Sequence, residues 1–375
     1  MTFSILQPAQ ILFGRGQAAR AADLARTFGP RGLVVHGASP VRAAPVLAAL
    51  GPDTLALACA SEPTLAMLET ATQTARLHRP DWVLAMGGGA ALDLGKALAA
   101  MIPAPGPALD HLEGVGKGLP LAAAPLPFIA VPTTAGTGAE VTKNAVIGLP
   151  EHGRKVSLRD DRMIARIAII DPALTDHCPW PVTLASGLDA VTQLIEPYVS
   201  HKATPYTDAI AFPAIEPALR ALVRLQDGEN DGARDALAWA SLCGGLALAN
   251  AGLGLVHGFA GVIGGRTGAA HGAICGALLG PVLSMNRALA VGQAREKLDR
   301  VCAIVAKVFG GTDDQAPAAL ANWAHAAGLA RLSDLGVTKN DHAAVATASQ
   351  SASSTKGNPV QVPHVDLCSI LERAG

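Results

Sequence analysis

The sequence has few aromatic residues, no closely spaced cysteines and no excess of charge of one sign. Phe, Trp and Tyr make up only 3% of the 375 residues, so a core must be built mainly from Ala, Val, Leu and Ile. The 29 Lys and Arg are balanced by 30 Asp and Glu, and no basic arm is present, which argues against a nucleic-acid partner. The six cysteines form no C-x-x-C pair, which argues against a disulfide framework or a cysteine zinc site and favours a reducing cytoplasm.

Signals for export and membrane insertion are also missing. The N-terminal stretch MTFSILQPAQILFGRG lacks the basic start and long apolar core of a signal peptide, so we expect no export. Residues 236–265 carry no formal charge and are long enough to cross a bilayer. They include Asn250, His257 and many glycines, however, and no aromatic belt. We therefore predict buried helices of a globular core and no membrane partner.

The pattern along the chain predicts two domains. A chain of 375 residues is longer than one hydrophobic core usually serves. In the first half, short apolar runs at 32–35, 82–86, 128–131 and 167–170 alternate with helical patterns such as 64–77, which is typical of a parallel α/β sheet. From Pro181 onward helical spacing dominates, up to a last short helix at 365–373. We expect an α/β domain over residues 1–177 and an all-α domain over residues 178–375, because DHCPWP (176–181) breaks the periodicity.

Two polar, glycine-rich segments follow predicted strands. Gly87, Gly88 and Gly89 end one strand and open a helix, so the backbone can approach a pyrophosphate at a free helix N-terminus. The segment 132–142, PTTAGTGAEVT, follows another strand and supplies threonine hydroxyls at the same sheet edge. Taken alone, the glycines fit a tight turn and the threonines fit turn or cap residues. Together they indicate a dinucleotide site.

A second group of residues has the chemistry of a metal site. Asp189 and Gln193 lie one turn apart on a predicted helix and both offer oxygen ligands. His257 and His271 follow in uncharged, glycine-rich helical surroundings. Either histidine alone is more often a satisfied core residue. One carboxylate and two imidazoles are nevertheless a usual ligand set for zinc or iron(II), with positions left for a substrate oxygen.

In this order the motifs resemble the iron-containing (group III) alcohol dehydrogenases along nearly the whole chain. The matching segments are FGRG (13–16), GGGAALDLGK (87–96), PTTAGTGAEVT (132–142), DP (171–172), GLDAVTQLIE (187–196), the histidines 257 and 271, and NP (358–359). The resemblance implies a dehydroquinate synthase-like fold, in which a Rossmann-like domain binds NAD(P), a helical domain holds iron or zinc, and hydride transfer occurs in the cleft between them. By motif, the cofactor-contacting places are Gly87, Gly88, Gly89, Asp93, Thr133, Thr134, Thr137 and Lys155. The metal and catalytic places include Asp189, His257 and His271.

The sequence departs from the family at two active-site positions. The fourth metal-ligand place is a histidine in typical members, and here it is Gln193, a weaker neutral oxygen ligand. The resemblance therefore leaves a weakly held metal, a different metal or no metal open. Four residues after His257, typical members carry a histidine often given a proton-relay role, and this chain has Gly261. The proton would then come from water, a ribose hydroxyl or the substrate.

The expected reaction is hydride transfer between NAD(P)H and a small aldehyde, ketone or alcohol. The strand end at 33–42 carries no carboxylate for a ribose, while Ser39 and Arg42 offer contacts for a 2′-phosphate, which favours NADP. The alternatives are a metal-independent reductase resembling maleylacetate reductase, a non-redox lyase resembling dehydroquinate synthase, and a binding protein without catalysis. By resemblance we expect a homodimer or a larger homo-oligomer.

Overall fold

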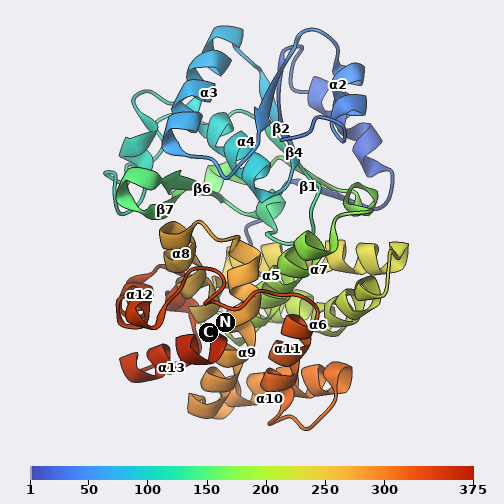
Figure 1. Cartoon of the computed structure of the whole chain (residues 1–375). Coiled ribbons are helices and arrows are strands. Elements are labelled where there is room, and N and C mark those ends of the chain that lie inside the picture. The colour runs from blue at the N-terminus through green and yellow to red at the C-terminus, as the bar shows by residue number, and fades with distance from the viewer. Residues whose placement is uncertain (1) are drawn as a thin grey trace. The chain divides into compact units, whose positions relative to one another are not determined.

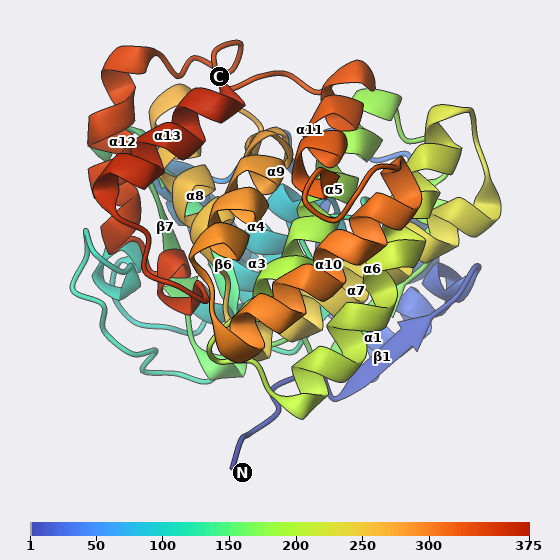
Figure 2. The ribbon, with the colours of Figure 1, turned by 90° about the horizontal axis from the view of Figure 1, so that it is seen from below.

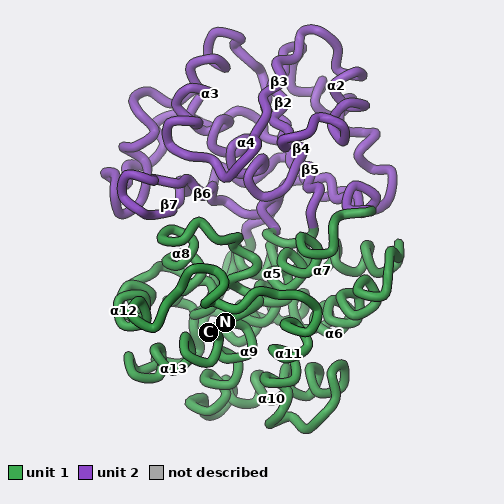
Figure 3. Tube along the Cα trace, in the orientation of Figure 1, with its two compact units in different colours: residues 1–5, 135–137, 177–375 green, residues 6–134, 138–176 purple. Residues whose placement is uncertain are grey.

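The computed structural model describes residues 2–375, which form the two compact units coloured separately in Figure 3. The α/β unit comprises residues 6–134 and 138–176. The helical unit comprises residues 135–137 and 177–375, together with the N-terminal residues up to Ile5. The predicted fold class, an α/β region followed by an all-α region, is confirmed.

A six-stranded parallel sheet is the framework of the α/β unit. In spatial order the strands are β1 (Gln10–Phe13), β8 (Ile167–Ile170), β5 (Phe128–Pro132), β4 (Trp82–Gly87), β2 (Gly32–Gly37) and β3 (Thr54–Cys59). The four apolar runs found in the sequence are β2, β4, β5 and β8, so those strand predictions are confirmed. From β2 the chain continues outward to β3, whereas from β4 it continues in the opposite direction to β5. The carboxyl ends of β2 and β4 therefore form the switch point at which open α/β sheets bind ligands.

Helices cover both faces of this sheet, as Figure 1 shows around β2 and β4. One face buries Leu33 and Val83 together with α3 (Leu65–His78) and α4 (Gly89–Met101). The other face buries Val34 and Leu84 with α1 (Ala21–Arg26) and α2 (Ala44–Leu50). Because successive strand residues point to opposite faces, a strand covered on both sides is apolar throughout. This explains why the central strands were readable as continuous apolar runs.

Four strands were not assigned from the sequence. β1 and β3 are the edge strands of the sheet and are only partly buried. β6 (Asn144–Leu149) and β7 (Arg154–Arg159) form a separate antiparallel hairpin. In β6 buried residues alternate with half-buried ones, so it contains no continuous apolar run.

The helical unit packs its helices around α5 and α9. Its helices are α5 (Trp180–Val199), α6 (Pro205–Gln226), α7 (Asp231–Ala251), α8 (Leu255–Thr267), α9 (His271–Leu289), α10 (Gly292–Phe309), α11 (Ala316–Ala326), α12 (His342–Ser351) and α13 (His364–Ala374). Figure 2 shows α10 lying along α6 and α13 beside α12. The core is dominated by Ala, Val, Leu and Ile, as the low aromatic content requires.

The uncharged stretch 236–265 corresponds to α7 and α8, which are separated by a bend of 98°. Within residues 2–375, α9 is the one helix whose length and composition alone would allow it to cross a membrane, and 61% of its apolar window is buried inside the protein. That burial is typical of a core helix.

Candidate active site

The carboxylate of the predicted metal set lies on α5. Asp189 and Gln193 are one turn apart and nearly inaccessible to solvent, with 1% and 3% of their surface exposed. Among the described residues, neither Asp189 Oδ1 nor Gln193 Oε1 has a hydrogen-bond partner. A buried polar oxygen without a partner is costly, so both atoms fit a position facing a cation.

His257 lies in the first turn of α8 and is fixed by a carboxylate from α5. Glu196 Oε2 lies 2.7 Å from His257 Nδ1 and accepts the backbone N–H of Gly254 at 2.9 Å, while Oε1 accepts the N–H of Val256 at 2.6 Å. Glu196 thus supplies the cap that the glycine at the N-cap position cannot provide. If Nδ1 donates to the carboxylate, Nε2 carries the lone pair and can bind a metal.

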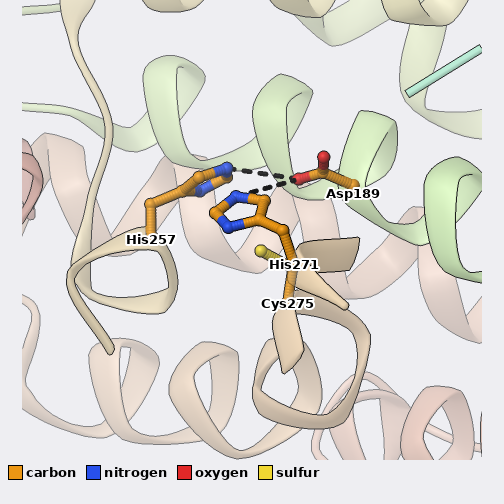
Figure 4. A group of neighbouring side chains, drawn as sticks. All are labelled: Asp189, His257, His271 and Cys275. Atoms are coloured by element: carbon orange, nitrogen blue, oxygen red, sulfur yellow. Dashed lines mark ion pairs between the residues drawn. The ribbon is translucent and has the colours of Figure 1, made fainter. Parts of the chain in front are cut away.

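His271 begins α9, Cys275 follows it one turn later, and the two complete a group of four donors (Figure 4). Nε2 of His257 lies 3.2 Å from Asp189 Oδ1, and Nε2 of His271 lies 4.0 Å from the same oxygen. One donor atom from each of the four residues lies within 4.8 Å of the others. For comparison, the N and O ligands of a four-coordinate zinc are separated by roughly 3.4 Å. The predicted Asp189, His257 and His271 are therefore brought together.

Electrostatics make this cluster attractive to positive charge. Burial raises the pKa of Asp189, but the close approach of His257 and the charge of His271 outweigh burial and hold it below its ordinary value. Burial lowers the pKa of His257, but the nearby Cys275 sulfur, the Glu196 carboxylate and the contact with Asp189 raise it well above its ordinary value. The same negative field favours a divalent cation.

The glycine turn lies at the switch point of the sheet. A Cβ at Gly87 would lie 2.6 Å from the Ala91 Cβ and 3.2 Å from the backbone nitrogen of Gly37, so only glycine allows β4 and α4 to pack this closely. Gly88 is the N-cap of α4, and no side chain caps the helix. The N-terminus of α4 therefore has the features of an anion site.

The predicted cofactor residues of the α/β unit lie around this turn and the neighbouring hairpin. Thr133 N donates to the Gly87 carbonyl at 2.9 Å, and a Cβ at Gly88 would lie 3.5 Å from Thr134 Oγ1. Asp93 Oδ2 accepts the Val146 N–H at 3.2 Å. The remaining predicted cofactor residues are Lys155, which pairs with Glu62; Ser39, which is exposed beyond β2; and Thr137, which belongs to the helical unit.

A buried lysine holds the threonine segment against α4. Lys96 Nζ donates to the carbonyls of Ala139 and Asn144 at 2.6 and 2.9 Å and to Thr142 Oγ1 at 3.1 Å. Burial lowers the pKa of Lys96 to about 8, although the negative charges of Asp93 and Glu140 oppose the shift. Lys96 therefore holds residues 139–144, which include the end of the threonine segment, against α4.

Three residues that lie in these sites were not predicted from the sequence. Cys275 was counted only among scattered cysteines, although it lies one turn after His271. Glu196 is seven residues after Asp189, hence two turns along the same helix face. Lys96 gave no signal, because only the packing of α4 reveals its burial.

Comparison with known proteins supports the resemblance. The model of the family "Iron-containing alcohol dehydrogenase" matches residues 8–172, and that of "Fe-containing alcohol dehydrogenase family, C-terminal" matches residues 183–375. The probable alcohol dehydrogenase EutG of Escherichia coli (strain K12) is 32% identical, over 96% of this chain and 90% of that protein. Lactaldehyde reductase of the same strain is 33% identical, over 83% of this chain and 81% of that protein.

Solved structures agree with this result. A 1,3-propanediol oxidoreductase superposes with a TM-score of 0.90 at 26% identity, over 100% of both chains. Sulfoacetaldehyde reductase from Bifidobacterium kashiwanohense, solved in complex with NAD⁺, superposes with a TM-score of 0.87 at 26% identity, over 100% of this chain and 99% of that chain. The fold, the motifs and the matches over both halves of the chain agree. The chain is thus an enzyme of nicotinamide-dependent alcohol and aldehyde oxidoreduction and belongs to the iron-containing alcohol dehydrogenase family.

Proposed function

We propose that the chain reduces a small aldehyde or ketone, or oxidises the corresponding alcohol, at a divalent metal held by Asp189, His257 and His271. One observation carries the proposal: His257 Nε2 and Asp189 Oδ1 are buried 3.2 Å apart, and neither has an aligned hydrogen bond within the described chain. With Nδ1 donating to Glu196, Nε2 and Oδ1 face each other as two acceptors that need a positive charge between them: a proton on the ring, which the raised pKa of His257 favours, or a bound cation. The donor set therefore fits the metal that the family name implies.

The chain's own residues would hold and orient the reacting groups. Glu196 fixes the ring of His257, and Asp189 supplies the negative charge that keeps a cation in place. When bound, a divalent cation supplies Lewis-acid polarisation of the substrate oxygen. When bound, a nicotinamide cofactor would supply or accept the hydride. Position 261 is glycine and cannot relay a proton to the substrate oxygen. We therefore propose that this proton comes from water, a ribose hydroxyl or the substrate.

The α/β unit supplies the proposed cofactor site. The uncapped N-terminus of α4 and the hydroxyls of Thr133 and Thr134 suit the phosphates of a dinucleotide. We propose a preference for NADP, because no carboxylate follows β2 and Ser39 is exposed there. Arg42 already donates to the Asp176 carbonyl at 3.1 Å, so Ser39 is the stronger candidate for a 2′-phosphate contact. A clear NADH preference in initial-rate measurements would contradict this choice.

The substrate class rests on the chain's relatives, whose names include lactaldehyde, 1,3-propanediol and sulfoacetaldehyde. We propose a small aldehyde or ketone, tested by NADPH oxidation with a panel of short-chain carbonyls. We also propose a cytoplasmic location, which the six free cysteines fit, and a homodimer or larger homo-oligomer, testable by light scattering.

The second candidate is a metal-independent reductase resembling maleylacetate reductase, which Gln193 and Gly261 favour because both replace polar active-site histidines of typical members. The two candidates separate in one assay. Metal removal should abolish turnover in the first case and leave it unchanged in the second. Net consumption of NADPH excludes the non-redox lyase in both cases.

A further inference from the structure

We propose that the thiolate of Cys275 is a direct ligand of the metal in this chain and substitutes for the histidine that position 193 lacks. The inference rests on the metal site proposed above and specifies how that site is completed. It concerns a residue that was not among the expected ligands.

The position of Cys275 on α9 favours this role. Cys275 follows His271 by four residues, so both side chains project from one face of the helix. The residue is fully buried, and its Sγ lies within 4.8 Å of a donor atom of each of Asp189, His257 and His271. Figure 4 shows the sulfur lying next to the two imidazole rings.

Glycines on either side of Cys275 bring α9 close to α5. A Cβ at Gly272 would lie 2.4 Å from the Ala185 carbonyl oxygen, and a Cβ at Gly276 would lie 2.8 Å from Leu188 Cδ1. Any larger residue at these two positions would push α9 away from α5. This close packing keeps Cys275 within reach of Asp189.

The surroundings of Cys275 differ from those of the other buried thiols. Burial raises the pKa of Cys302 to about 11 and that of Cys243 to about 12, as expected for structural cysteines in an apolar core. Cys275 is the one cysteine in residues 2–375 that shares a donor cluster with acidic and imidazole side chains. A merely structural role would not require these neighbours.

The ligand chemistry also fits. An Asp carboxylate and a Cys thiolate together neutralise a divalent cation, and two neutral imidazoles complete four ligands of the types that zinc takes. A substrate oxygen would then bind as a fifth ligand, a coordination number to which catalytic zinc sites expand. When the metal binds, a metal–sulfur bond forms, the S–H bond breaks and the proton passes to the buffer. A neutral amide at Gln193 offers less charge and a harder donor, so we expect the thiolate to contribute more to affinity and to favour zinc over iron.

Cobalt(II) provides a direct test, because thiolate ligation gives a charge-transfer band that oxygen and nitrogen ligands lack. The metal-stripped full-length protein is titrated with CoCl₂ under anaerobic conditions. The same titration is run on Cys275→Ser, Gln193→Ala and two cysteine controls, the buried Cys302→Ala and the half-exposed Cys368→Ser. Circular dichroism checks that each variant is folded. Zinc affinity is measured in parallel by competition with a chromophoric chelator.

We expect the thiolate band in the wild type, in Gln193→Ala and in both controls, and its loss in Cys275→Ser. Loss of a residue that only hydrogen-bonds to a metal ligand typically lowers metal affinity about 10–100-fold. Cys275→Ser removes a direct ligand, so its zinc affinity should fall by at least that much. Stoichiometric cobalt binding without the band would overturn the inference but leave the proposed metal-dependent function intact. No cobalt binding by the wild type would overturn both. Because the wild-type spectrum alone decides between these outcomes, misfolding of the Ser variant would not prevent the test.

Discussion

Glu196 is predicted to control both the stability of α8 and the metal affinity of His257. Its carboxylate faces three N–H groups, those of Gly254, Val256 and His257 Nδ1, at 2.6 to 2.9 Å. Glu196→Gln keeps the shape of the side chain but replaces one acceptor oxygen by an NH₂ donor. At least one of the three N–H groups must then face a donor.

The magnitude follows from these contacts. A buried N–H without an acceptor costs about 1–3 kcal/mol. Loss of a buried negative charge at a helix N-terminus costs up to about 2 kcal/mol. We therefore expect the free energy of unfolding to fall by about 2–4 kcal/mol. An NH₂ that faces His257 Nδ1 shifts the ring proton to Nε2, the metal-binding atom, so zinc affinity should fall about 10–100-fold.

Two controls separate the effects of Glu196. Asn358→Ala removes another buried acceptor at the same helix end, since Asn358 Oδ1 accepts the Leu255 N–H at 3.2 Å, and it does not touch His257. It should lower stability without changing zinc affinity. Glu216→Gln, on the half-exposed Glu216 of α6, should leave zinc affinity unchanged and lower stability by no more than about 1 kcal/mol, because it loses only exposed ion pairs with Arg220 and Lys307. Urea unfolding and chelator competition measure the two quantities. A stability loss in Glu196→Gln with unchanged zinc affinity would refute the positioning role.

Three further predictions test other parts of the account. Gln193→His restores the ligand of typical family members and should raise iron or zinc affinity by about tenfold or more, measured by chelator competition; unchanged affinity would mean that position 193 lies outside the ligand set. A Cβ at Gly261 would meet no atom within 4 Å, so Gly261→His should fold and give kcat a new ionisation near pH 6.5, about the ordinary histidine value, whereas Gly261→Ala should not. Burial raises the pKa of Glu140 to about 7 in the folded protein. Between about pH 4.5 and 7 the folded protein therefore binds a proton that the unfolded chain has lost, so the free energy of unfolding falls as the pH rises through this range. Glu140→Gln removes that loss, and its stability relative to wild type should rise by up to about 3 kcal/mol across this range in urea unfolding; a pH-independent difference would contradict it.

The fold could be read from the sequence where burial is two-sided. β2, β4, β5 and β8 are covered on both faces and appear as continuous apolar runs. In the second half of the chain, apolar residues recur at the spacing of an α-helix. The edge strands β1 and β3 and the β6–β7 hairpin lack such runs, because each has an exposed or half-exposed face. Local periodicity does not distinguish such strands from loops.

The candidate site was predictable only in part. Asp189, His257 and His271 were found through motif order, which carries the resemblance, whereas their approach to within 3.2 to 4.0 Å depends on how α5, α8 and α9 pack. The spacing of Cys275 from His271 and of Glu196 from Asp189 was visible in the sequence. Their roles became apparent only when α8 and α9 brought the partners together.

The most direct test of the account is the metal content of the protein as purified. Elemental mass spectrometry on protein prepared without chelator or metal-affinity tag should find about one zinc or iron per chain, and His257→Ala should lose it together with carbonyl reduction. Circular dichroism confirms that the variant is folded. A metal-free wild type that reduces carbonyls at full rate, and gains nothing from added zinc or iron, would contradict the metal-polarised mechanism and favour the metal-independent reductase.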